Sequence, residues 1–159
     1  MSTHTKNHLS FLYKNSEPND IFTVEQFSDE HKMLKTTARK FIDREVVPAL
    51  EKIEQKQFEE TKKLIAKAGE LGLIGADIAE GDGGLELGKV SAAIIAEEMA
   101  RGRSFSITFG GQTGIGALPI AYFGNDDQKE RYLTKILSGE SIAAYALTEP
   151  SAGTDALSI

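Results

Sequence analysis

Apolar residues recur every three or four positions over most of the chain from Ser28 onward, which is the spacing of a buried helix face. Ser28 is a favourable N-cap, and the apolar positions after it predict a helix that Pro48 ends or bends. A second helix is predicted from about Glu59 to Glu70, where Gly69 and Gly72 mark its end. The residues on its buried face would be Leu64, Ala68 and Leu71.

A third helix is predicted from about Gly88 to Arg101, after a loop that turns at Gly81–Gly84. Its apolar residues lie on two faces, which is typical of a helix in the middle of a bundle. Glu97 and Arg101 are four residues apart in the order that favours a salt bridge within the helix.

Residues 104–124 carry no charged side chain, so their length alone is compatible with a membrane span. Gln112, Pro119 and several glycines nevertheless make this segment a poor lipid-facing helix. We therefore predict a buried, glycine-interrupted helix rather than a membrane span.

The pattern changes near the C-terminus. Asn125 and Gln128 are spaced as a capping box and begin a further helix, which Gly139 ends. The buried stripe of that helix would be Tyr132, Leu133, Ile136 and Leu137. Residues 142–147 form a short apolar run that predicts a buried strand. The predicted fold class is mainly α, an antiparallel helical bundle followed by the first strand of a second domain.

Composition narrows the possible functions. With 159 residues the chain is long enough for one domain with a sizeable core. Its net charge of -6, without a Lys/Arg cluster, argues against a nucleic-acid partner. The absence of cysteine excludes disulfides and thiolate metal sites and fits a reducing compartment, so we expect a cytoplasmic location. Residues 1–27 lack the apolar core of a secretory signal and form an arm that is either extended on a surface or disordered.

Most catalytic constellations are missing from the sequence. The three histidines, His4, His8 and His31, all lie in the polar N-terminal fifth, which argues against a nucleophilic triad. No set of His, Asp and Glu residues has metal-ligand spacing. Glu97 and Glu98 point about 100° apart on a helix, so salt bridges are a better interpretation than a proton-sharing pair. Residues 110–116 are rich in glycine but lack the Lys-Ser/Thr of a P-loop, so they indicate either close helix packing or a channel for an apolar ligand.

Residues 145–155, with the sequence Tyr-Ala-Leu-Thr-Glu-Pro-Ser-Ala-Gly-Thr-Asp, are the strongest candidate for a binding site. Gly153 would let the backbone approach a ligand closely, and Pro150 would stiffen the turn. The loop also offers the hydroxyls of Thr148, Ser151 and Thr154. This combination suits a small ligand with carbonyls and phosphates along its edge.

The same loop closely resembles the flavin-binding signature of the acyl-CoA dehydrogenase family. Residues 123–133 and 137–140 resemble the segment that precedes that signature, and 96–101 and 83–85 match further family motifs. The resemblance covers about residues 28–159. The amino-acid sequences of residues 104–119 and of the N-terminal arm most resemble those of the long-chain branch of the bacterial fatty-acid β-oxidation enzymes.

The resemblance implies a flavoprotein that uses FAD to oxidise a fatty acyl-CoA to the trans-2-enoyl-CoA and passes electrons to an electron-transfer flavoprotein. It implies a helical domain over 28–141, after the arm 1–27, and the start of a middle β domain over 142–159. Thr154, where the family usually has Ser, would also lie near the acyl-CoA. Glu86 stands where the family usually has glycine. The cofactor-binding residues implied by the signature are Tyr145, Ala146, Leu147, Thr148, Gly153 and Thr154.

In this family a later helical domain supplies the catalytic glutamate and the contacts of the homo-oligomer. We therefore assign no catalytic residue and no metal ligand here, and expect this chain to be an inactive N-terminal fragment. Two alternatives stay open. One is a non-catalytic helical module that binds acyl chains or a partner protein. The other is the N-terminal part of an acyl-CoA oxidase, which would pass its electrons to O2.

Overall fold

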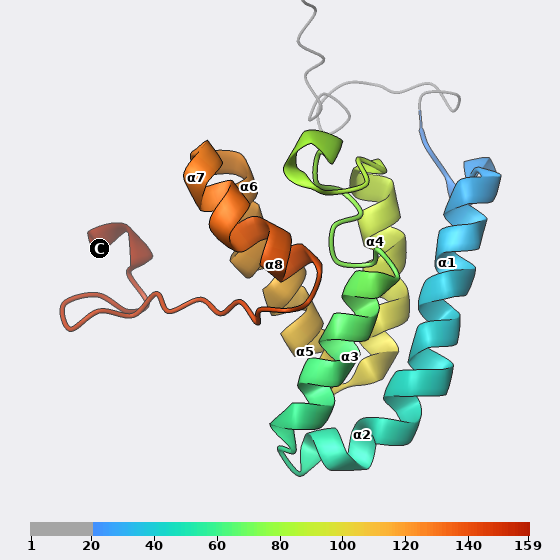
Figure 1. Cartoon of the computed structure of the whole chain (residues 1–159), viewed down its shortest axis with the longest axis horizontal. Coiled ribbons are helices and arrows are strands. Elements are labelled where there is room, and N and C mark those ends of the chain that lie inside the picture. The colour runs from blue at the N-terminus through green and yellow to red at the C-terminus, as the bar shows by residue number, and fades with distance from the viewer. Residues whose placement is uncertain (1–20) are drawn as a thin grey trace, which may run out of the picture.

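A computed structural model describes residues 21–159. The longer helices form the larger part of the body, and a group of shorter helices packs beside them (Figure 1). Consecutive helical runs alternate in direction in Figure 1, as an antiparallel bundle requires. The predicted mainly α fold class is therefore confirmed. The elements are α1 Asp29–Phe41, α2 Val47–Glu54, α3 Phe58–Glu70, α4 Gly88–Met99, α5 Ser104–Gly110, α6 Ala117–Phe123, α7 Asp126–Gln128 and α8 Thr134–Leu137.

The first helix begins at the predicted N-cap. Ser28 Oγ accepts a hydrogen bond from the His31 backbone N–H, and Ser28 N–H donates to His31 Nδ1, so the histidine completes a capping box. A π-helical turn, Ile42–Val46, joins α1 to α2, and Pro48 lies in the first turn of α2. The chain bends here, as Figure 1 shows, because proline has no N–H to donate and the widened turn absorbs the mismatch. Of the predicted arm, residues 1–20 lie outside the described residues.

The core lies between the helices α1 to α5 and continues to α6 and α8. Phe41, Phe105 and Phe109 form a chain of tilted aromatic contacts with ring centroids 5.9 and 6.3 Å apart. Ile42, Ile65 and Leu133 are completely buried around them. In the predicted stripes Leu64, Ala68, Leu133, Ile136 and Leu137 are buried as expected. Leu71 and Tyr132 are exposed, so the stripe predictions are wrong at these two positions.

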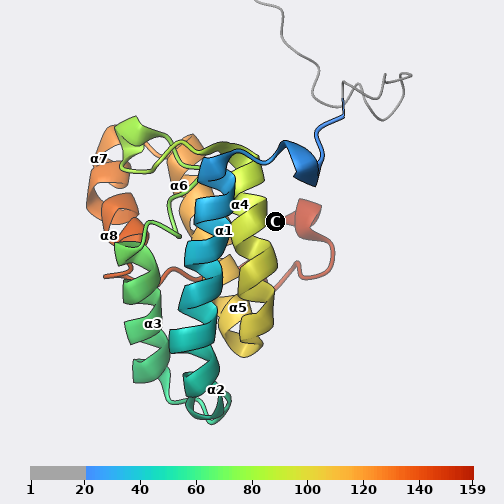
Figure 2. The same ribbon diagram turned by 90° about the vertical axis from the view of Figure 1, so that its right-hand side faces the viewer.

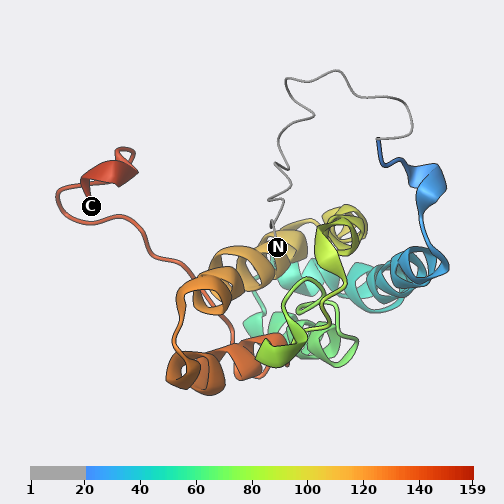
Figure 3. The ribbon, with the colours of Figure 1, turned by 90° about the horizontal axis from the view of Figure 1, so that it is seen from above.

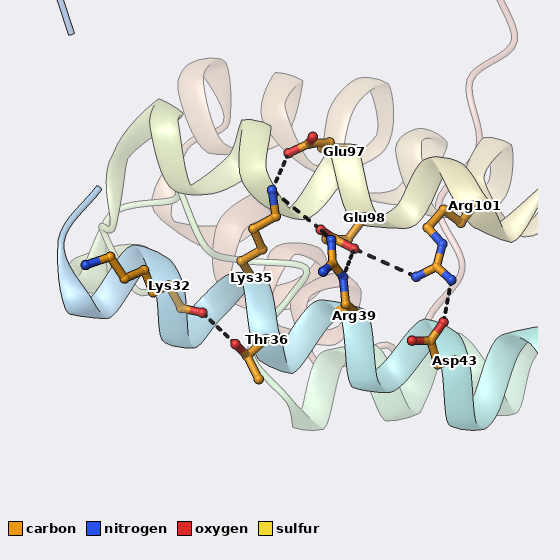
Figure 4. A network of polar contacts seen from close by, with 8 residues as sticks. All are labelled: Lys32, Lys35, Thr36, Arg39, Asp43, Glu97, Glu98 and Arg101. Carbon is orange, nitrogen blue, oxygen red and sulfur yellow. Dashed lines mark hydrogen bonds and ion pairs between the residues drawn. The ribbon is translucent and has the colours of Figure 1, made fainter. Parts of the chain in front are cut away.

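A network of charges links α1 to α4 (Figure 4). Glu98 is 2% exposed and accepts two hydrogen bonds from Arg39, at 3.0 and 2.7 Å. Lys35 bonds to Glu97, and Arg101 pairs with Asp43 at 2.7 Å. The predicted salt bridge between Glu97 and Arg101 is wrong, because Lys35 of α1 and Asp43 of the π-helical turn that follows α1 are closer partners for them. The salt-bridge interpretation of the Glu97–Glu98 pair is confirmed.

Residues 104–123 form a continuous helical run, α5, a π-helical segment Gly111–Gly116, and α6. One side of this run is buried through Phe105, Phe109 and Ala117, but Phe123 is 87% exposed, so the segment is only half buried. Within residues 21–159 no helix is both long and apolar enough to cross a membrane.

The chain after residue 141 leaves the helical body, as Figures 1 and 3 show, and Figure 2 views the same segment from the side. Residues 142–147 are extended but mostly exposed, and residues 21–159 contain no sheet in which they could pair. The prediction that this segment is a buried strand is therefore wrong, because the segment is exposed. An apolar extended segment becomes buried only when a neighbouring strand or layer covers it.

Candidate functional site

The segment Tyr145–Asp155 forms an extended approach followed by a tight turn. Glu149 N–H donates to the Ala152 carbonyl at 2.9 Å, and Ala152 N–H donates to the Glu149 carbonyl at 3.2 Å. These reciprocal bonds close a turn with Pro150 and Ser151 at its tip. Ala152 is the buried residue within the segment, at 6% exposure.

The turn brings the two halves of the predicted site together. A Cβ placed on Gly153 would lie 3.8 Å from Thr148 Cγ2, so the end of the extended approach faces the glycine across the turn. Thr154 follows directly and is exposed, and Ser158 Oγ donates a hydrogen bond to Asp155 just beyond it. Thr148, Gly153 and Thr154 thus form one local surface.

The extended approach presents unused hydrogen-bonding groups. Among the described residues, no hydrogen bond is recorded for the backbone N–H groups of residues 145–148. Tyr145 is 55% exposed, and Leu147 is also exposed. A surface that combines free backbone N–H groups with apolar side chains is typical of a ligand-binding site. Once a ligand or a further part of the chain covers this surface, the N–H groups need hydrogen-bond acceptors, which the covering group must supply.

These features fit a flavin. The free N–H groups of residues 145–148 could donate to the carbonyl and nitrogen edge of an isoalloxazine ring. The Thr148 and Thr154 hydroxyls and the missing side chain at Gly153 suit the ribityl and phosphate groups of FAD. By contrast, residues 21–159 contain no cluster of three His, Asp or Glu side chains that could hold a metal ion.

A buried polar residue, Gln112, holds the base of this segment. Its side chain bonds to backbone groups of Ile136, Ser141 and Ala143. The sequence marks Gln112 as a polar residue in an uncharged helix, but the pattern along the chain did not predict what it would contact.

The glycine-rich helix leaves room beside it. A Cβ added at Gly110, Gly111 or Gly114 would meet no other heavy atom within 4 Å. Gly116 differs, because a Cβ there would overlap the Cβ of Ala143. The glycines therefore serve two purposes, open space at the first three positions and close packing at the last.

Two cavities flank this helix. One, of about 450 Å³, lies between the α2–α3 turn, the start of α5 and Ile142, and Phe58 and Ile53 are among its apolar lining residues. The other, of about 280 Å³, lies between α4 and α5 and is lined mainly by small and apolar residues such as Ala92, Ala96 and Gly110. Two spaces for an apolar ligand thus adjoin α5, and a further cavity of about 620 Å³ lies between residues 22–27 and α4.

Comparison with known proteins identifies the family. The family model described as "Acyl-CoA dehydrogenase, N-terminal domain" matches residues 28–140. A probable acyl-CoA dehydrogenase of Bacillus subtilis is 50% identical over 92% of this chain and 25% of its own length. The long-chain specific acyl-CoA dehydrogenase of rat mitochondria is 37% identical over 86% of this chain and 31% of its own length.

A solved structure gives the same result. The acyl-CoA dehydrogenase of Bacillus anthracis, crystallised in complex with FAD, is 51% identical and superposes with a TM-score of 0.88 over 94% of this chain and 26% of that one. The chain thus spans about a quarter to a third of the length of these relatives. From its helical domain, its sequence and its similarity to these proteins, the chain belongs to the acyl-CoA dehydrogenase family.

Proposed function

We propose that this chain is the N-terminal helical domain, together with the first flavin-binding segment, of an FAD-dependent enzyme that oxidises fatty acyl-CoA to trans-2-enoyl-CoA. The observation that carries the proposal is the exposed segment of residues 145–148, whose backbone N–H groups make no hydrogen bond among the described residues. The Bacillus anthracis relative, which binds FAD, supports it.

Six residues of the segment 145–154 have a proposed role. Tyr145, Ala146, Leu147 and Thr148 lie along the isoalloxazine ring through their backbone groups, and the Thr148 hydroxyl adds a further donor. Gly153 and Thr154 approach the pyrophosphate, and Thr154 also lies near the acyl-CoA. Bound FAD supplies the hydride acceptor, while these residues orient it and cover one face.

The proton from the substrate Cα needs a base, and we assign that role to no residue of this chain. The proposed electron acceptor is an electron-transfer flavoprotein, the proposed location is the cytoplasm, and the complete enzyme is proposed to be a homo-oligomer. The proposed domain boundaries are 27/28 and 141/142, and a helical body that runs from Asp29 to Leu137 supports them.

The proposal is tested by flavin content and turnover. The purified chain should show no turnover of palmitoyl-CoA with an artificial electron acceptor. A protein in which this chain is followed by a middle β domain and C-terminal helical domain of the family should contain stoichiometric FAD and turn palmitoyl-CoA over. If the three-domain protein folds correctly but contains no flavin and does not oxidise palmitoyl-CoA, the proposed function is refuted.

We further propose that the glycine-rich helix lines the acyl tail, in a long-chain enzyme. Gly114 is the position to test, because its missing side chain leaves open space, whereas a side chain at Gly116 would collide with Ala143. In the protein with all three domains, Gly114→Leu should lower kcat/KM for palmitoyl-CoA at least about tenfold relative to butyryl-CoA. Unchanged selectivity would show that the tail lies elsewhere.

A further inference from the structure

Gln112 is a fully buried polar residue in an otherwise uncharged helical run. It lies in the π-helical segment Gly111–Gly116 and is 0% exposed. Each polar atom of its side chain has a backbone partner: Nε2 donates to the Ile136 carbonyl at 2.8 Å and to the Ser141 carbonyl at 2.7 Å, and Oε1 accepts from the Ala143 N–H at 2.8 Å. A buried amide saturated in this way specifies one arrangement of the groups around it.

The partners of Gln112 lie where the chain leaves the helical body. The Ile136 carbonyl belongs to the last turn of α8, and Ser141 and Ala143 belong to the extended segment that follows. Ser141 N–H is held as well, since it donates to the Lys135 carbonyl at 3.0 Å. The side-chain amide thus bonds a carbonyl and an N–H two residues apart, which is how a neighbouring strand would hold one edge of this segment.

Gly116 provides an independent contact with the same segment. It lies four residues after Gln112, and a Cβ on it would overlap the Cβ of Ala143. Ala143 can reach the Gln112 amide only because this position has no side chain. Two residues of one helical segment, one through hydrogen bonds and one through its size, therefore set the position of Ala143.

We propose that Gln112, supported by Gly116, is the positioning residue for the flavin-binding segment. Tyr145 follows Ala143 by only two residues, so fixing the Ser141–Ala143 backbone fixes the point and direction from which residues 145–148 extend. The same contacts fix the glycine-rich helix, which we propose lines the acyl channel, relative to the flavin-binding residues 145–148. This inference rests on the proposed function for its meaning, but its geometry can be tested without any ligand.

The test is amide hydrogen exchange, measured by NMR on the full 159-residue chain. Gln112→Met keeps a side chain of similar length but removes the amide. Gly116→Ala leaves the Gln112 amide in place but adds a methyl that overlaps Ala143 Cβ and lies 2.9 Å from the Gly111 carbonyl oxygen. In both variants the Ala143 amide should exchange about tenfold faster, and the resonances of residues 145–148 should shift. The Ile65 and Ile95 amides, in α3 and α4, should keep their exchange rates. Gly114→Ala is the matched control, because a Cβ there meets nothing within 4 Å.

Three results would overturn the inference. The first is an unchanged exchange rate of the Ala143 amide in Gln112→Met, and the second is a lack of shifted resonances at residues 145–148. The third is an equal acceleration of exchange at the Ile65 and Ile95 amides, which would mean that Gln112 supports the whole fold.

A second experiment titrates the same proteins with FAD and measures flavin fluorescence. If the wild-type chain binds FAD, Gln112→Met should weaken binding about tenfold, and equal affinity would overturn the positioning role. If a three-domain protein carrying wild-type residues binds no FAD, the proposed function fails, while the exchange data still decide whether Gln112 positions the segment.

Discussion

At the scale of single residues, Lys89 joins the start of α4 to two other parts of the body. Its Nζ donates to Asp77 Oδ2 and, at 2.7 Å, to Tyr122 Oη, and lies 5.4 Å from the centre of the Tyr122 ring. The hydrogen bond to Asp77, and after it the bond to Tyr122, raise the pKa of Lys89 above its ordinary value. Because the folded pKa is above the unfolded one, the stabilisation is complete below the unfolded pKa and is lost as pH rises through the folded pKa.

Lys89→Met should therefore lower the free energy of unfolding by about 0.5 kcal/mol at neutral pH, a value discounted for solvent because the side chain is mostly exposed. The difference from the wild type should shrink toward zero as pH rises through the raised pKa of Lys89. Urea denaturation at a series of pH values measures it. Lys40→Met, at an exposed lysine of α1, is the control and should show no such trend. A Lys89→Met difference that persisted at high pH would contradict the assignment.

Glu98 shows how a buried charge depends on its partners. Arg39 gives it two short hydrogen bonds, whereas Lys35 and Arg101 approach it only to 3.7 and 4.0 Å. Arg39→Met should therefore leave a buried carboxylate poorly paired and lower the free energy of unfolding. Lys35→Met should cost much less, and the double variant Arg39→Met/Glu98→Leu should regain most of the lost stability because no buried charge is left. Urea denaturation of the four proteins decides, and a double variant less stable than Arg39→Met would contradict this explanation.

At the scale of helices, α2 and α3 end in the same way but with different residues. In both, the N–H of the second residue past the C-cap bonds back to the helix, Gln57 to the Lys52 carbonyl and Leu73 to the Ala68 carbonyl. This is the Schellman arrangement, and it needs one residue with positive φ. α3 supplies Gly72, with φ +70°, but α2 supplies Lys56, with φ +62°.

Lys56→Gly should accordingly raise the free energy of unfolding by about 0.5–1 kcal/mol, because glycine adopts this conformation without Cβ strain. Gly72→Ala should lower it by at least about 1 kcal/mol, since the added methyl also approaches Leu85. Thermal denaturation of both variants beside the wild type measures the shifts. Lys56→Ala, which keeps the strain but shortens the side chain, separates the backbone effect from loss of the lysine. A Lys56→Gly protein no more stable than Lys56→Ala would contradict the prediction.

The same scale shows what sequence can predict. The caps at Ser28 and Asn125 were predictable because their hydrogen bonds join residues three apart. The partners of Glu97 and Arg101 were not, because they lie on α1 and on the π-helical turn after it, some sixty residues earlier in the chain. In the candidate site the loop composition identified residues 145–155 but not Gln112. Its contacts depend on how the π-helical segment meets residues 141–143, which no local pattern encodes.

At the scale of the whole molecule, the helical run of residues 104–123 leaves apolar side chains in solvent. Ile107 is 77% exposed and Phe123 is 87% exposed, and Ile115 and Tyr122 between them are more than half exposed. Large apolar side chains along one helical run are unusual on a monomer's surface and favour association. Under the proposed function further domains cover this surface. The alternative of a non-catalytic interaction module would use it to bind a partner.

Both interpretations imply that the chain alone should associate with itself. In sedimentation velocity over a concentration series, the wild type should show dimers or larger species, and Ile107→Lys/Phe123→Lys should be monomeric. Because both side chains are exposed, the double variant should unfold within about 0.5 kcal/mol of the wild type. Gln55→Lys/Gln57→Lys adds the same charge at exposed positions between α2 and α3 and should leave association unchanged. A wild-type chain that stays monomeric at every concentration would show that this surface needs no cover, and would remove the main structural support for an interaction module.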